Sequence, residues 1–146
     1  MAAYLSTELG GTANQTAVPV GRKPVATVYQ ARLKRLRASF VYNAQTTSDT
    51  LVVGNLPAGA SFAFGVLTAD TSSGSTTLAI GTSASSAKYK AAAAFTATDT
   101  PTVFGKAAVV GADPLAAEEQ VIVTLAAATA PSSGNLYVDL YYSMPN

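Results

Sequence analysis

Few side chains in this sequence are of the types that carry covalent or acid–base chemistry. The 146 residues contain no histidine, no cysteine and no tryptophan. The first two types supply most of the proton transfer, thiol chemistry and zinc binding in proteins. A nucleophilic serine would therefore need a lysine or a carboxylate as its base. Ser85 and Lys88 have the Ser-x-x-Lys spacing, but the companion motifs of serine–lysine enzymes are missing, so this chemistry is disfavoured.

The carboxylates do not form a recognisable catalytic or metal-binding motif. Asp49, Asp70, Asp99 and Asp113 each lie among Thr, Ser, Gly or Pro residues, where aspartate usually bonds to the local backbone. No Asp-x-Asp-x-Asp-Gly loop for calcium and no Gly-x-Gly-x-x-Gly or Walker pattern for nucleotides is present. We therefore expect no enzymatic activity, no cofactor and no metal.

Charge is scarce and unevenly distributed along the chain. Only 12% of the residues are charged, about half the usual ~25%. The first 42 residues hold six basic side chains against one acidic, and the rest of the chain holds three against seven. Such a split is typical of docking to an acidic partner, to a second copy or to nucleic acid. Because no aromatic residues are interleaved with residues 32–37 and the remainder is acidic, we expect no nucleic-acid partner.

The N-terminal segment lacks the periodicity of a helix or strand. Gly10, Gly11, Pro19 and Pro24 interrupt it. We expect residues 1–24 to form an extended arm that orders on contact, with an ordinary disordered terminus as the alternative. The N-terminus also lacks the pattern of a signal peptide, and no apolar run approaches the ~18 residues of a membrane helix.

The rest of the chain, residues 25–146, predicts an all-β domain, either a β-sandwich or a jelly-roll-like fold. Short segments rich in alternating apolar residues recur between turn residues, which is the pattern of sandwiches, jelly rolls and barrels. In the first long segment Leu36, Ala38, Phe40 and Tyr42 share one face, and the basic side chains lie on the other. Residues 25–29 are also β-prone, and the expected strands are 32–42, 50–53, 61–68, 76–80, 101–108, 120–126 and 135–142.

Helix is expected only in short turns. The alanine-rich residues 86–95 and the Asp-Pro start of residues 113–119 are the two candidates. Residues 31–37 also have a helical alternative, but the following Phe-Val-Tyr favours a strand.

The last predicted strand has two different faces. Leu136, Val138, Leu140 and Tyr142 suit a core, whereas Tyr137, Asp139 and Tyr141 lie on the opposite face. Tyrosine is common in protein interfaces because its ring buries area while its hydroxyl finds a partner. Packing against a neighbouring strand is the alternative.

Four segments resemble a family of small structural proteins of tailed-phage virions, some of which are capsid cement or decoration proteins. They are DTLVVGNLPAGA at 49–60, LAIGTSASSAKYKAAAAFT at 78–96, DTPTVFG at 99–105 and GNLYVDLYY at 134–142.

The resemblance implies a β-sandwich or jelly-roll subunit that binds the outer capsid surface as a small homo-oligomer, a trimer, and stabilises the shell. Its partners would be the major capsid protein and further copies of itself, on virions assembled in the host cytoplasm, with no membrane partner. The alternatives are a tail, fibre or baseplate component, or a carbohydrate-binding β-sandwich, which the absence of tryptophan disfavours. The candidate protein-interface residues are Arg22, Lys23, Arg32, Arg35, Arg37, Tyr137 and Tyr141.

Overall fold

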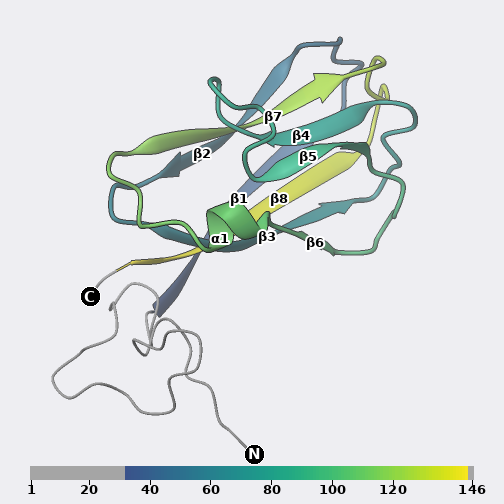
Figure 1. Ribbon diagram of the computed structural model, residues 1–146. Helices are drawn as coiled ribbons and strands as arrows, with labels where there is room; N and C mark the ends of the chain where they lie inside the picture. Colours follow the sequence, from purple (N-terminus) through teal and green to yellow (C-terminus); the bar gives the residue numbers. More distant parts are fainter. Residues whose placement is uncertain (1–31, 145–146) are drawn as a thin grey trace, which may run out of the picture.

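Two antiparallel four-stranded sheets pack face to face in the computed structural model, which describes residues 32–144 (Figure 1). The first sheet has the strand order β1-β8-β3-β6 and the second β2-β7-β4-β5. The elements are β1 (Arg32–Val41), β2 (Thr50–Leu56), β3 (Ser61–Ala69), β4 (Thr77–Gly81), β5 (Lys90–Ala94), β6 (Thr102–Phe104), α1 (Ala107–Val110), β7 (Glu119–Ala126) and β8 (Asn135–Met144).

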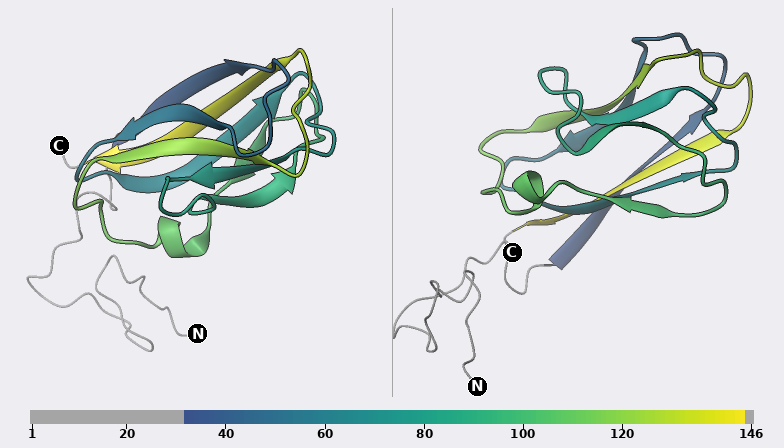
Figure 2. Two further views of the ribbon diagram at one scale, coloured as in Figure 1. Left: turned by 90° about the horizontal axis from the view of Figure 1, so that it is seen from above. Right: turned by 45° about the vertical axis from the view of Figure 1, so that its right-hand side comes forward.

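The strand pairing identifies the sandwich as a jelly roll. The first strand pairs with the last, the second with the seventh, the third with the sixth and the fourth with the fifth. These nested pairs are joined into sheets by β8 beside β3 and by β7 beside β4. The nested pairs therefore form one long antiparallel ribbon that is wrapped into two sheets. These sheets are the two layers in Figure 2. The prediction of an all-β sandwich is confirmed.

The core lies between the inner faces of the two sheets. From β8 it takes Leu136, Val138 and Leu140, all fully buried, as their alternation predicts. Leu67 and Phe104 lie on the same layer, and the second sheet supplies Leu78, Ile80, Val121, Val123 and Leu125. Leu36, Ala38 and Phe40 of β1 are half-buried and pack against this cluster.

Gly65 in β3 makes room for a large side chain of the edge strand. It is paired with Phe104 in β6. A Cβ atom on Gly65 would lie only 2.1 Å from Cζ of Phe104. The glycine thus leaves space for the phenylalanine ring to pack over the strand and into the core.

The helix expected in residues 86–95 is wrong, because β5 occupies residues 90–94 of that segment. Buried aromatic residues hold both ends of the strand: Tyr89 donates its N–H to Ile80 O, and Phe95 O accepts from Ser73 N. Alanine's helix preference amounts to at most about 1 kcal/mol per residue. A short helix also has an unfavourable nucleus, so these tertiary contacts prevail.

The helix expected in residues 113–119 is also absent from the structure. Leu115 instead exchanges backbone hydrogen bonds with the 59–60 turn: its N–H donates to Ala60 O, and its carbonyl accepts from Gly59 N. These bonds take up the groups that a helix would need. The expected strand at 101–108 is correspondingly shorter, since β6 ends at Phe104 and α1 follows after Gly105 and Lys106.

Other expectations hold, or lie outside the described residues. Helix is limited to the single turn α1 within residues 32–144, as expected. The alternative of a helix at 31–37 is wrong from Arg32 onward, where β1 begins. The arm at 1–24, the β-prone residues 25–29 and the domain boundary between them lie outside the described residues. No helix among residues 32–144 is long and apolar enough to cross a membrane.

Candidate interaction surface

The face of the first sheet that points away from the core carries most of the candidate residues. We call it the outer face. The strand registers place its side chains in rows across four strands, such as Arg37, Asp139, Val66 and Val103. Its residues are Leu33, Arg35, Arg37, Ser39, Val41, Phe64, Val66, Thr68, Val103, Asn135, Tyr137, Asp139 and Tyr141.

An ion pair lies at the centre of the outer face. Nε and Nη2 of Arg37 each donate to one carboxylate oxygen of Asp139 at 2.7 Å. The Asp139 side chain is only 7% exposed, whereas that of Arg37 is 49% exposed. Nε of Arg35 lies 4.0 Å from the same carboxylate. The hydrogen bond and charge of Asp139 raise the pKa of Arg37, so the guanidinium stays charged.

Aromatic rings surround this ion pair. Phe64 and Tyr141 stack with their ring centroids 4.7 Å apart and their planes 19° from parallel. The guanidinium of Arg37 lies 6.0 Å from the ring centroid of Tyr137. All three rings are only half-buried. Tyrosine and arginine are the residue types most enriched at the energetic centres of protein interfaces, so this arrangement suits a protein partner.

Exposed aliphatic side chains extend the outer face to its edges. Leu33, Val41 and Val103 are 53%, 65% and 67% exposed. Together with the aromatic rings they form an apolar surface around a neutralised charge pair. Burial of such a surface against a partner is favourable, because it removes apolar area from water.

The structure brings together four of the seven candidate residues, namely Arg35, Arg37, Tyr137 and Tyr141. Arg32 lies on the opposite side of β1. It shares that side with Lys34 and is paired with Met144 of β8. Arg22 and Lys23 lie outside the described residues.

Sequence reasoning missed the contributions of β3 and β6. Phe64, Val66 and Val103 alternate with core residues as Tyr137 and Tyr141 do. The period-two pattern therefore marks them as facing one side of a sheet, but it does not tell which strands are neighbours. Asp139 lies on the face opposite the core residues, as the alternation predicts, and it is only 5% exposed because Arg37 covers it.

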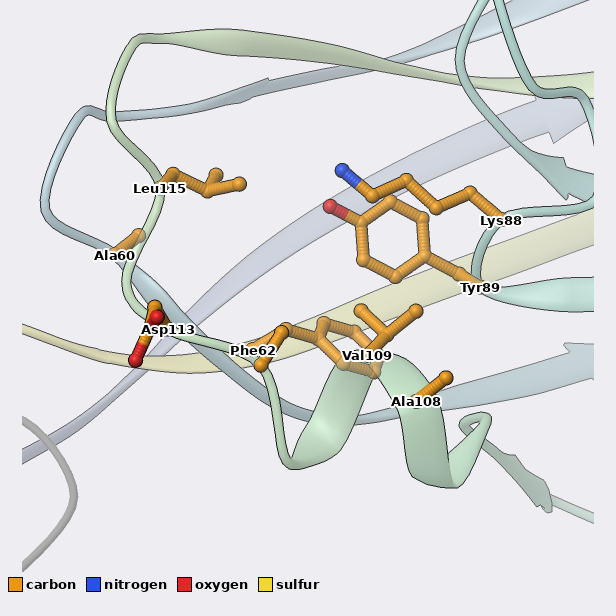
Figure 3. A pocket seen from close by; sticks show the side chains of 9 residues that line it. Ala60, Phe62, Lys88, Tyr89, Ala108, Val109, Asp113 and Leu115 are labelled. Atoms are coloured by element: carbon orange, nitrogen blue, oxygen red, sulfur yellow. The ribbon is translucent and has the colours of Figure 1, made fainter.

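A second candidate is a small cavity beside α1, shown in Figure 3. It measures about 80 Å³ and is bounded mainly by apolar side chains, among them Phe62, Val109 and Leu115. Tyr89 also lines it and donates its hydroxyl to Glu119, which accepts from Lys88 as well.

These polar groups satisfy one another rather than aim at a ligand. Burial, reinforced by the hydrogen bond to Glu119, raises the pKa of Tyr89, so the phenol stays protonated and cannot act as a base. Within residues 32–144, no cluster of three or more Asp and Glu residues is placed to hold a metal ion. We therefore interpret the cavity as a gap in side-chain packing at the edge of the core.

Comparison with solved structures finds the same fold in two phage capsids. A chain from the capsid asymmetric unit of cyanophage Pam1 matches with a TM-score of 0.66 and 21% identity, over 92% of this chain and 96% of that one. A chain from the capsid of Ralstonia phage GP4 matches with a TM-score of 0.60 and 17% identity, over 86% and 90%. These similarities extend over nearly all of both chains and establish a shared fold.

No protein-family model matches this sequence, and no curated protein does.

Proposed function

We propose that this protein is a non-enzymatic structural component of a bacteriophage capsid. The observation that carries the proposal is the match of its jelly roll, nearly end to end, with chains from two phage capsids. Because each match covers most of both chains, the matched chains are similar in length to this one. The absence of histidine and cysteine from the sequence agrees with a role that needs contact area rather than chemistry.

Within the capsid we propose the role of a cement, or decoration, protein. It would bind the outer surface of the shell, contact the major capsid protein and stabilise the particle as a homotrimer. A low content of charged residues and a surface rich in small side chains favour large contact areas. The basic residues near the start of the chain, including Arg22, Lys23 and Arg32, would dock on the shell.

The outer face is proposed as the contact between subunits. Its charge pair is internally neutralised, so two copies can approach without strong repulsion, while its rings and aliphatic side chains supply apolar area. Closed symmetry would hide this area from water.

The experiment compares two matched valine substitutions by sedimentation. Val103→Arg places a charge on the outer face, at a side chain that is 67% exposed and dispensable for the core. Val52→Arg does the same at a 51% exposed position on the second sheet. We expect Val103→Arg to sediment as a monomer and Val52→Arg to keep the wild-type mass. Equal masses for both variants would reject the outer face as the subunit contact.

The role itself is tested by adding the wild-type protein to capsids purified without it. We expect it to bind the particles and to raise the temperature at which they open. Failure to bind expanded or unexpanded capsids would contradict the cement role.

A further inference from the structure

A jelly roll has four edge strands, and in this one they differ in how they are protected. The edges are β1 and β6 of the first sheet and β2 and β5 of the second. An edge strand exposes unpaired N–H and C=O groups that can accept another strand. Proteins usually block such pairing with charged side chains, with bulges or with very short strands.

β1, β6 and β2 each carry one such feature. β1 presents four basic side chains, and β6 is only three residues long. β2 has a register shift between Val52 and Gly54.

β5 is the edge with the smallest side chains. Four of its five residues are exposed alanines. Its one charged side chain, Lys90, turns back and donates to the carbonyls of Leu78 and Ala91. A register shift opposite Leu78 and Ile80 affects its pairing with β4, but Ala93 and Ala94 pair regularly. Small uncharged side chains leave this edge open to another backbone.

The sequence also contains a β-prone segment outside the described residues. Residues 25–29 read Val-Ala-Thr-Val-Tyr, with no charge and no proline. β-Branched and aromatic residues of this kind favour strands. The segment has five residues, as does β5.

The geometry prevents residues 25–29 from reaching β5 of the same molecule. Only Gln30 and Ala31 separate them from the start of β1. Three extended Cα steps span at most about 10 Å. β1 faces β2, and β5 lies at the far edge of the second sheet. A strand added beyond β5 would lie four strand spacings from β2, about 19 Å, and the two sheets are about 10 Å apart. Both distances must be crossed from β1, so the linker of about 10 Å is too short.

We propose that residues 25–29 of one copy add as a strand to the β5 edge of a neighbouring copy. The second sheet would then gain a fifth strand from the next subunit, so that each subunit in a closed ring both gives and receives a strand. The backbone hydrogen bonds supply the affinity, and the alanines allow close approach. This inference rests on the proposed homo-oligomer and names the contact that links its subunits along this edge.

The absence of native cysteine permits a direct cross-linking test on the full-length chain. Two differently tagged preparations are mixed, one carrying Thr27→Cys and the other a single Cys substitution at Ala91, Ala92, Ala93 or Ala94. The control mixture pairs Thr27→Cys with Val52→Cys on the β2 edge. We expect about tenfold more disulfide-linked heterodimer for at least one β5 position than for the control, because a paired strand holds the thiols at high effective concentration.

A pair of proline substitutions gives an independent readout. Thr27→Pro removes a backbone donor from the segment, whereas Thr12→Pro changes a position outside it. We expect sedimentation to show a loss of oligomer for Thr27→Pro only. A wild-type oligomer with no preferential 27-to-β5 cross-link, or with equal masses for both proline variants, would overturn the strand exchange while leaving the homo-oligomer intact. A monomeric wild type, free and on capsids, would instead reject the oligomer itself.

Discussion

Tyr42 and Tyr89 are both buried, but they differ in how their hydroxyl groups are satisfied. The hydroxyl of Tyr89 donates to Glu119. That of Tyr42 has no hydrogen-bond partner among residues 32–144. A buried polar group without a partner costs free energy, whereas a bonded one contributes.

Phenylalanine substitutions at these two positions should therefore have opposite effects. We expect Tyr42→Phe to raise the free energy of unfolding by about 1 kcal/mol and Tyr89→Phe to lower it by about 1–2 kcal/mol. Denaturant unfolding at neutral pH measures both. A loss of stability in Tyr42→Phe equal to that in Tyr89→Phe would contradict the hydrogen-bonding assignment.

Tyr42 also predicts a dependence of stability on alkaline pH. Burial, with a smaller contribution from Asp70, raises its pKa from 10.0 to about 12. A raised pKa means that the folded state holds the proton longer than the unfolded chain does. The stabilisation is therefore complete below pH 10 and is lost as the pH rises towards about 12. Tyr42→Phe should flatten this decline in unfolding measurements between these pH values, and an unchanged slope would argue against it.

At the scale of elements, the central and edge strands should differ in local stability. β8 pairs with both β1 and β3, and β7 pairs with both β2 and β4. β6 has three paired residues, and α1 has no buried residue and no side-chain cap. Local openings involve the segments with the fewest buried contacts and the most exposed hydrogen bonds.

We expect the amide protons of β7 and β8 to exchange most slowly with solvent, and those of β6 and α1 to exchange fastest. Hydrogen exchange followed by mass spectrometry measures this order. Protection in α1 equal to that in β8 would show that the helix is part of the cooperative core.

The sequence predicts the elements best where alternation is long and apolar. Residues 61–69 and 135–144 follow this pattern, and both were expected as strands with nearly the observed ends. Residues 90–94 were misassigned because four consecutive alanines have no period-two pattern. Their conformation depends on Tyr89 and Phe95, which are buried by contacts distant in sequence. For the outer face, the sequence predicts the residues of β1 and β8 but not those of β3 and β6. Alternation gives the side of the sheet on which a side chain lies, but it does not tell which strands are neighbours.

For the whole molecule, we propose that the sandwich folds on its own and that the N-terminal arm, residues 1–24, serves attachment. Residues 32–144 contain the two sheets and the core. An arm that orders only on contact gives up roughly 1–2 kcal/mol of backbone entropy per residue, so a large contact surface is needed to hold it.

Deletion of residues 2–24 should therefore leave the sandwich folded but weaken attachment to capsids. The deletion retains residues 25–29, so the oligomer should persist. A single Arg→Ala change at the exposed Arg32 should reduce binding less, because a solvated ion pair contributes only about 0–1 kcal/mol. Binding curves on purified capsids measure both effects. Wild-type occupancy and heat resistance in the deletion variant would identify the arm as an ordinary terminus.

We propose that this jelly roll lies on the outer surface of the capsid. The most direct test is a cryo-electron microscopy reconstruction of intact virions of the phage that encodes it, with the chain located by fitting the two sheets. We expect density for three copies around a symmetry or local threefold axis on the outer shell, in contact with the major capsid protein. Density for this chain in the tail, fibre or baseplate, or its absence from the virion, would contradict a role on the outer capsid surface.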